Sequence, residues 1–329
     1  MRLKLIFILL FIISNFSFIN GLYASDSDLE HDMGLLIGWW AEQFAKLMSF
    51  AGSSEINTPA ETLLNGNFEA GFLFNIGVTK TDTNAYKRLD YYVFERGQEA
   101  PIKSLPIFTG LLYGKYGISK DYDIGIKLGG LTIKPTDQTL AVENKVSGLD
   151  LRMQMQRRQK EGFDLVGGIT INSVKGYINL KSTGIFTQDT VVMTDFLTGA
   201  STSYIRTFTG YHDIKVDWDF TSIALRLVGS TAWSFFCPVL GLQVDLNFGD
   251  AKGKIQYDMK NIVLTSTMTG TSFSEPDTSM IGEKSTTIPQ VNLRVLYGFE
   301  FNFSSVGIWY SGEIAGDNNS FALGLRVKF

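Results

Sequence analysis

Apolar and polar side chains alternate along the last residues of the chain, 319–329. Successive side chains of a β-strand point to opposite faces of a sheet, so this pattern predicts a strand with one apolar and one polar face. The strand ends on an aromatic residue at the last position, whereas most chain termini are polar and frayed. The apolar face contains Phe321, Leu323, Leu325, Val327 and Phe329, and the opposite face contains Ala322, Gly324, Arg326 and Lys328.

The same period of two recurs in many segments from residue 67 onward, most clearly at 149–156 and 291–301. In each segment, among them 105–113, 214–218 and 255–259, we expect the apolar face to contact lipid and the polar face to line an interior. About twelve segments approach the roughly 9–11 residues that a tilted strand needs to cross a membrane. The pattern predicts an all-β fold, an antiparallel up-and-down transmembrane β-barrel with about twelve strands. Segments 90–96, 174–181 and 203–209 either extend neighbouring strands above the membrane or add a hairpin, which would give fourteen strands.

The connections between these segments predict an orientation. We expect short turns at one end of the barrel and long loops at the other, as in outer-membrane barrels, whose periplasmic turns are short and whose extracellular loops are longer. The expected short turns are 116–120, 158–162, 219–222, 249–251 and 302–305, and the expected long loops are 79–104, 132–145, 174–211 and 266–288. Two shorter connections, 230–234 and 314–319, are expected on the long-loop side.

The N-terminal part of the chain has two further segments. Residues 1–24 have a basic start at Arg2 and Lys4 and a short apolar run, which predicts a signal peptide cleaved near Ala24. Residues 25–66 contain an amphipathic helix followed by a linker, and residues 67–329 form the barrel. We expect the helix either to plug the lumen or to pack against the periplasmic mouth. Its apolar stripe includes Leu36, Trp40, Phe44 and Leu47.

Composition narrows the classes of function. The net charge is −4, which gives no electrostatic basis for nucleic-acid binding. The single cysteine, Cys237, excludes an intrachain disulfide and a cysteine-based zinc site. We find no metal-ligand spacing and no phosphate-binding loop, so we expect no cofactor and no metal.

Charged residues on the expected inward face are the candidate functional positions. Both signs occur, so they either line a pore without strong ion selectivity or pair across the lumen and close it. The candidates for lining a pore are Lys127, Asp150, Arg152, Asp217, Arg226, Asp245, Arg294, Glu300 and Arg326.

The closing strand resembles that of bacterial outer-membrane β-barrel proteins, and the barrel region resembles small, uncharacterised members of that class. The resemblance implies that Leu325, Val327 and Phe329 form an assembly signal read by the barrel-assembly machinery. It also implies export by periplasmic chaperones to the outer membrane of a Gram-negative cell, where lipid is the surrounding partner. A weaker resemblance to outer-membrane fatty-acid transporters rests on Asn57-Thr58-Pro59-Ala60, which is similar to their Asn-Pro-Ala motif with Thr58 inserted.

Enzymatic activity is not expected. Outer-membrane phospholipases of similar size carry a serine two residues after a strand histidine, but here Ile214 follows His212 at that position. The adjacent His212 and Asp213 are similar to part of the omptin protease site, yet neighbouring strand residues point to opposite faces. We therefore predict a porin-like passive channel or transporter for small solutes of unknown identity. The alternatives are a non-conducting structural or surface-recognition barrel that uses its long loops, and a transporter of a hydrophobic, fatty-acid-like ligand.

Overall fold

A computed structural model describes residues 26–51, 59–92, 100, 102–135, 139–158, 162–194 and 201–329. The expected signal peptide therefore lies outside the described residues. Helix α2 (Asp26–Ala51) precedes a single antiparallel sheet, and the short helix α3 (Thr83–Lys87) follows the first strand. The twelve strands of this sheet among the described residues are β1 (Phe68–Lys80), β2 (Ser104–Gly117), β3 (Tyr122–Ile133), β4 (Leu140–Gln156), β5 (Asp164–Thr194), β6 (Ser201–Ser230), β7 (Phe236–Ser266), β8 (Ser272–Glu275), β9 (Thr278–Thr287), β10 (Val291–Phe303), β11 (Val306–Ala315) and β12 (Asn318–Lys328).

The sheet closes into a barrel, as the sequence predicted. Each strand from β1 to β7 pairs with the next, β7 pairs with β10, and β12 returns to β1. β8, β9 and β10 lie end to end along β7 in one register. In an antiparallel pair of constant register the residue numbers of two paired residues always add up to the same value. This holds for Thr265 with Ser272, Asp250 with Thr287 and Leu246 with Val291. Within the described residues, ten strands therefore surround the interior at the level where β10 pairs with β7.

An apolar belt surrounds the barrel on its outer face. Phe72, Leu112, Leu242 and Leu323 are between 46% and 64% exposed although they are large and apolar, as expected for a surface that lipid covers. The further exposed members of the belt are Phe74, Ile124, Ile126, Leu128, Leu149, Leu151, Ile169, Ile171, Leu225, Leu227, Leu240, Leu293, Val295, Ile308 and Leu325. No helix in the described part of the chain combines the length and apolar character needed to cross a membrane.

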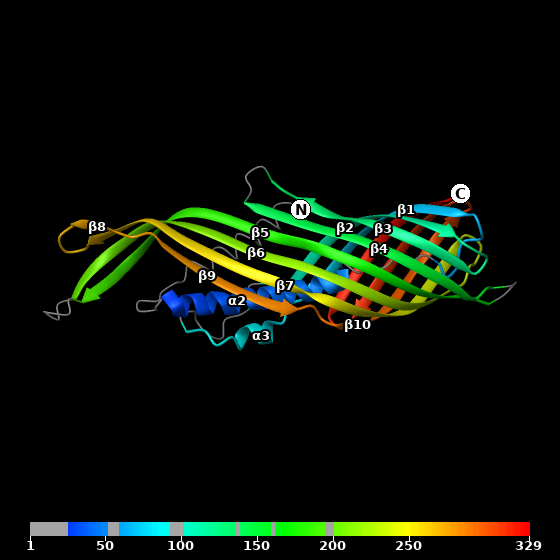
Figure 1. Ribbon diagram of the computed structural model, residues 1–329, viewed down its shortest axis with the longest axis horizontal. Helices are drawn as coiled ribbons and strands as arrows, with labels where there is room; N and C mark the ends of the chain where they lie inside the picture. The colour runs from blue at the N-terminus through cyan, green and yellow to red at the C-terminus, as the bar shows by residue number, and fades with distance from the viewer. Residues whose placement is uncertain are drawn as a thin grey trace.

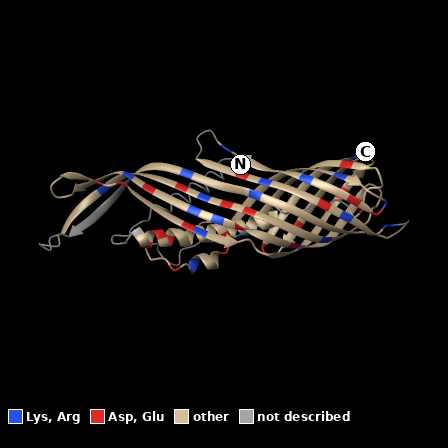
Figure 2. Ribbon diagram, in the orientation of Figure 1, with Lys and Arg blue, Asp and Glu red and all other residues tan. Residues whose placement is uncertain are grey.

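Three strands, β5, β6 and β7, continue far beyond the belt on one side. β5 and β7 have 31 residues each, which corresponds to about 100 Å of extended chain, several times the length that the membrane requires. With β9, the far parts of β5, β6 and β7 form an extension of the barrel, which fills the left half of Figure 1. Figure 2 shows that Lys, Arg, Asp and Glu residues occur along these strands in the extension. The expected long loops 174–211 and 266–288 are therefore largely strand, and segments 174–181 and 203–209 extend β5 and β6.

Two expected turns are wrong. Residues 219–222 and 249–251 lie inside β6 and β7. The connection 231–235 joins these strands at the end where β2 and β3 also connect, so the expectation that 230–234 lies on the long-loop side is also wrong. We call this end, which also carries the β4–β5 and β10–β11 connections, the short-turn end. The total of twelve strands agrees with the expectation, although the structure divides the region after residue 214 differently.

Candidate functional site

The interior of the barrel contains buried ion pairs near the short-turn end. Arg152 on β4 donates to Asp123 on β3 at 2.5 Å, and Arg226 on β6 donates to Asp150 on β4 at 2.6 Å. Arg326 on β12 bridges Glu69 on β1 and Glu300 on β10. Buried charges are stable when they are paired in this way, and an unpaired one would be costly.

A second charge cluster holds the C-terminal end of α2. Arg294 on β10 is fully buried, pairs with Asp245, and donates to Glu313 at 2.7 Å. The same guanidinium donates to the backbone oxygens of Phe50 at 2.7 Å and Ser49 at 3.0 Å, and it lies 4.6 Å from the Phe50 ring centroid. The last turn of α2 has no basic residue of its own, so Arg294 supplies the cation that the negative end of the helix dipole favours.

The helix and the extension approach each other at backbone distance. A Cβ atom on Gly282 of β9 would lie 2.6 Å from the backbone nitrogen of Gly34, and one on Gly253 of β7 would lie 2.7 Å from the Ile37 oxygen. Gly38 of α2 is close to the Lys284 side chain in the same way. Gly253 and Gly282 of the strands and Gly38 of the helix therefore allow α2 to pack directly on the strands.

Aromatic side chains surround α2 on its other sides. Phe44 stacks on Trp218 of β6 with ring centroids 6.2 Å apart, and Trp39 donates to the Asp82 backbone oxygen at 3.0 Å. Tyr86 of α3 packs edge-on against Trp39. The segment 81–92 thus covers α2 from the side opposite the sheet, and a helix enclosed all round is expected to be apolar on most of its surface.

Residues 59–67 cross the interior at the short-turn end. The Ala60 nitrogen donates to Ser230 at 2.8 Å, the Thr62 nitrogen to Gln154 at 2.8 Å, and the Leu63 nitrogen to Asp123 at 2.9 Å. These partners lie on β6, β4 and β3, so the segment is bound to inward-facing side chains around the ring. The described residues therefore occupy the interior at the short-turn end and at the opposite end, where α2 ends.

The structure places the predicted site residues as follows. Leu36, Trp40 and Leu47 are buried and Phe44 is half-buried, with α2 at the end of the ring opposite the short-turn end rather than at that mouth. Leu325, Val327 and Phe329 point outward on the closing strand. The inward-facing and buried or largely buried candidates are Lys127, Asp150, Arg152, Arg226, Asp245, Arg294, Glu300 and Arg326. Whether these residues line a conducting path remains a prediction.

Asp217 requires a correction. Its side chain is 43% exposed and pairs with Lys215 at 2.7 Å on the outer face of the extension. The inward positions of this part of β6 are instead Val216 and Trp218, which are buried beneath α2. A strand whose apolar face packs on a helix has the same alternation as a strand whose apolar face contacts lipid. The pattern alone therefore predicts, wrongly, that Asp217 points inward.

The expected lipid face of 105–113 is corrected for the same reason. Leu105, Ile107, Leu111 and Tyr113 are all at most 6% exposed and point inward. Sequence reasoning also missed Glu69 and Glu313 as ion-pair partners. Glu69 lies between the outward residues Phe68 and Ala70, and this alternation is a signal that would place it inside.

His212 and Asp213 do not form a joint site. His212 is buried on the inner face, with its ring centroid 4.4 Å from that of Tyr257. Asp213 points outward and pairs with Lys181 at 3.5 Å. Burial lowers the pKa of His212, so its imidazole is neutral at neutral pH.

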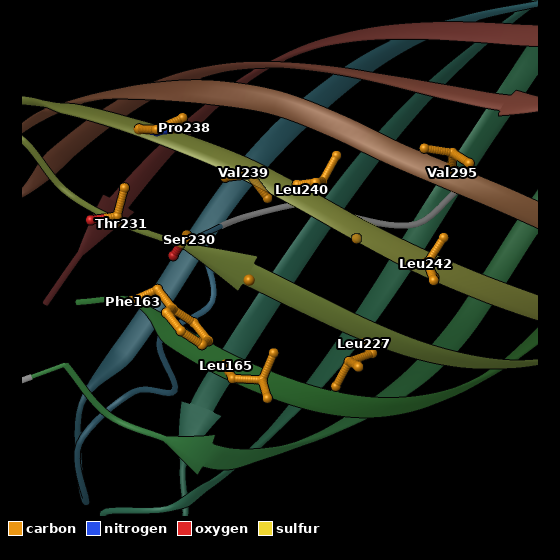
Figure 3. A pocket seen from close by; sticks show the side chains of 12 residues that line it. Phe163, Leu165, Leu227, Ser230, Thr231, Pro238, Val239, Leu240, Leu242 and Val295 are labelled. Atoms are coloured by element: carbon orange, nitrogen blue, oxygen red, sulfur yellow. The ribbon is translucent and has the colours of Figure 1, made fainter.

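Two hollows occur on the outer wall. One, of about 600 Å³, lies beside Gly229 and is lined by the belt residues Leu227, Leu240, Leu242 and Val295 (Figure 3). Because it opens on the lipid-facing side of the wall, we expect lipid chains rather than a solute to fill it. The other, of about 430 Å³, lies between charged residues just beyond the belt. Its charged lining residues are Glu143, Lys145, Lys175, Asp217, Asp219, Asp250 and Lys252.

No protein-family model and no curated protein matches this chain. Among solved structures, it is similar to the β-domain of the Bordetella autotransporter Brka (10% identity, TM-score 0.30, 80% of this chain and 99% of that chain covered). It is similar to the P. putida toluene transporter TodX (10% identity, TM-score 0.29, 83% and 93% covered) and to a Pseudomonas aeruginosa FadL homologue (10% identity, TM-score 0.24, 88% and 97% covered).

With its outward apolar belt and inward charges, the chain has the fold of an outer-membrane β-barrel. In this barrel the mixed charges of the interior are paired to a large extent, across adjacent strands or across strands with one strand between them. Asn57 and Thr58, on which the resemblance to fatty-acid transporters partly rests, lie outside the described residues.

Proposed function

We propose that the protein is a non-conducting barrel of the outer membrane that holds a platform for protein contact away from the cell surface. The observation that carries this proposal is the occupied interior. Ten strands enclose little more space than eight, whose interior side chains fill, whereas porins with aqueous channels have 16–18 strands. Here α2, the buried ion pairs and residues 59–67 fill that limited space.

The extension supports the second half of the proposal. With the short-turn end in the periplasm, β5, β6, β7 and β9 project outward from the cell. Their outer face carries charges of both signs. On neighbouring β4, the hydrogen bonds from Lys134 and Lys145 lower the pKa of Glu143 to about 2, which keeps this carboxylate ionised. Near the far end, Ile185 and Met268 are 80% and 82% exposed, which suits contact with a protein surface.

Two measurements test the proposal. Refolded wild-type protein in planar bilayers should show no conductance at any voltage, and stable single-channel steps would contradict it. Cells that display the wild type should attach to protein-coated surfaces more than cells that display Ile185→Glu or Met268→Glu. A matched control, Leu64→Glu at the short-turn end, faces the periplasm and should leave attachment unchanged.

A gated channel for small solutes is the second candidate, favoured by one observation. Asn75 Oδ1, Thr109 Oγ1 and Trp309 Nε1 lie inside the ring, buried and without a hydrogen-bond partner in the described structure. Buried polar atoms normally bind water when no protein group is available, so a hydrated path could start here. Conductance that appears only after α2 is undocked by Arg294→Met would support this candidate over a permanently closed barrel.

A further inference from the structure

The two ends of the N-terminal segment lie at opposite ends of the barrel. The Ala51 backbone oxygen accepts from Asn75 at 3.4 Å, within the part of β1 that carries the belt residues Phe72 and Phe74. After the interval 52–58, Ala60 and Thr62 are bonded at the short-turn end. Ala51 and Ala60 are each 1% exposed, and both lie inside the ring of strands.

From Ala51 the helix leads away from the short-turn end. The Ile281 nitrogen of β9 donates to Glu30 at 3.2 Å, and Ile281 pairs with Gln256, ten residues along β7 from Leu246, which pairs with Val291 at the start of β10. Ten strand residues correspond to about 33 Å. The helix from Glu30 to Ala51 rises by about 32 Å, so helix and strand give the same displacement. The start of α2 therefore lies far beyond the belt, alongside β9 (Figure 1).

Contacts on two elements fix this direction. Asp32 near the start of α2 accepts from the Tyr92 nitrogen at 2.8 Å, and His31 stacks on the Tyr92 ring at 4.5 Å. At the other end, Arg294 binds the last two carbonyls before Ala51. The acidic residues Asp28, Glu30 and Asp32 near the start of the helix and the cation at its end both agree with the helix dipole.

We propose that the barrel carries its own N-terminal segment through the membrane, so that the start of α2 ends on the outside of the cell. A periplasmic short-turn end, together with the observed positions of residues 26–51 and 59–63, leaves the start of α2 on the opposite side. The substrate of this step is the extended N-terminal polypeptide of the same chain, which moves through the ring before α2 docks on the extension. The proposal does not depend on whether the finished barrel conducts or binds a protein.

Cysteine labelling tests the topology in a Cys237→Ser background, which removes the single native thiol. Ser27→Cys reports on the exposed first turn of α2, Lys175→Cys on the outer face of the extension, and Leu64→Cys on the short-turn end. A membrane-impermeant maleimide on intact cells should label Ser27→Cys as fully as Lys175→Cys, while Leu64→Cys should react only after lysis. Labelling of Ser27→Cys only after lysis would overturn the proposal.

A second variant guards against a misfolded reporter. A short epitope inserted immediately before Asp26 in the full chain should be detected by antibody on intact cells and removed by external protease. The heat-modifiable mobility of the barrel must be retained in each variant, so that only assembled protein is scored. An epitope that stays protected in intact cells while the barrel is assembled would place the N-terminus in the periplasm and sink the proposal.

Discussion

Replacement of Arg294 by methionine should release α2 from the barrel. The change removes the cation between Asp245 and Glu313, and it removes the donors to the Ser49 and Phe50 carbonyls. Loss of one member of a buried ion pair costs about 3–5 kcal/mol, and each orphaned buried acceptor costs about 1–3 kcal/mol. If only about 3 kcal/mol of this total falls on docking, the undocked population rises by roughly a hundredfold.

Trypsin sensitivity at Lys46 measures this release. Lys46 is half-buried in the docked helix, where it pairs with Glu42 at 2.7 Å, so cleavage after it should require undocking. Arg226→Met is the matched control, since Arg226 is also buried and pairs with Asp150 of β4 rather than with α2. Both variants should lower the urea midpoint of the refolded barrel, but only Arg294→Met should expose Lys46.

A triple variant separates the two effects of Arg294. Addition of Asp245→Asn and Glu313→Gln to Arg294→Met removes the stranded carboxylates, so it should restore much of the urea midpoint. It cannot restore the donors to the helix carbonyls, and Lys46 should remain sensitive. If Arg294→Met leaves Lys46 as resistant as in the wild type, Arg294 does not hold the helix and the reasoning is refuted.

Three further predictions concern the seat of the helix, pH and the belt. Gly282→Ala should weaken the docking of α2 by about 1–3 kcal/mol, because the new Cβ would collide with the Gly34 backbone. Gly34→Ala has 3.8 Å of clearance and should stabilise the helix by up to about 1 kcal/mol. Equal trypsin sensitivity of the two variants would refute this. Folding lowers the pKa of His212, so below about pH 6.5 the unfolded chain binds more protons than the folded barrel, and stability should fall as the pH drops through that value. If His212→Phe shows the same pH dependence of its urea midpoint as the wild type, His212 is not the group responsible. Leu242→Arg should destabilise the refolded barrel by about 2–4 kcal/mol, whereas the outward Lys254 of the same strand should tolerate leucine, and similar costs for both would move the membrane boundary.

The alternation of apolar and polar residues predicts the structure correctly where each face of a strand has the same surroundings from one end to the other. The closing strand and β10 have outward apolar residues along their length and inward charges at Arg294, Glu300 and Arg326, and the structure confirms both patterns. β7 is different because Leu242 and Phe248 point to lipid, while Ile255 and Tyr257, of opposite parity, point to α2. Between these residues the apolar side chains change from one face of the strand to the other. Such a change predicts two strands, but here it marks the membrane boundary within one strand.

The amino-acid composition of the extension predicts loops rather than strands. The far parts of β5 and β6 are rich in Thr, Ser and Gly, which are residues of solvated loops, but Thr is also β-branched and favours strands. The docking of α2 could not be predicted from its apolar stripe alone. Its position depends on Gly253, Gly282 and Arg294, whose partners are distant in sequence and become neighbours only when the barrel closes.

The unbroken register of β7 constrains how the chain can change in length. From Phe236 to Met259 every residue keeps its partner without interruption, first on β10 and then on β9, apart from the short link at 288–290. Loss of a single residue near Gly249 would exchange the two faces of everything on one side of it, setting Lys252 and Lys254 against the helix and Ile255 against water. Insertions and deletions in this strand are therefore tolerable only in pairs, matched in the partner strand, so the height of the extension can change only in steps of two residues.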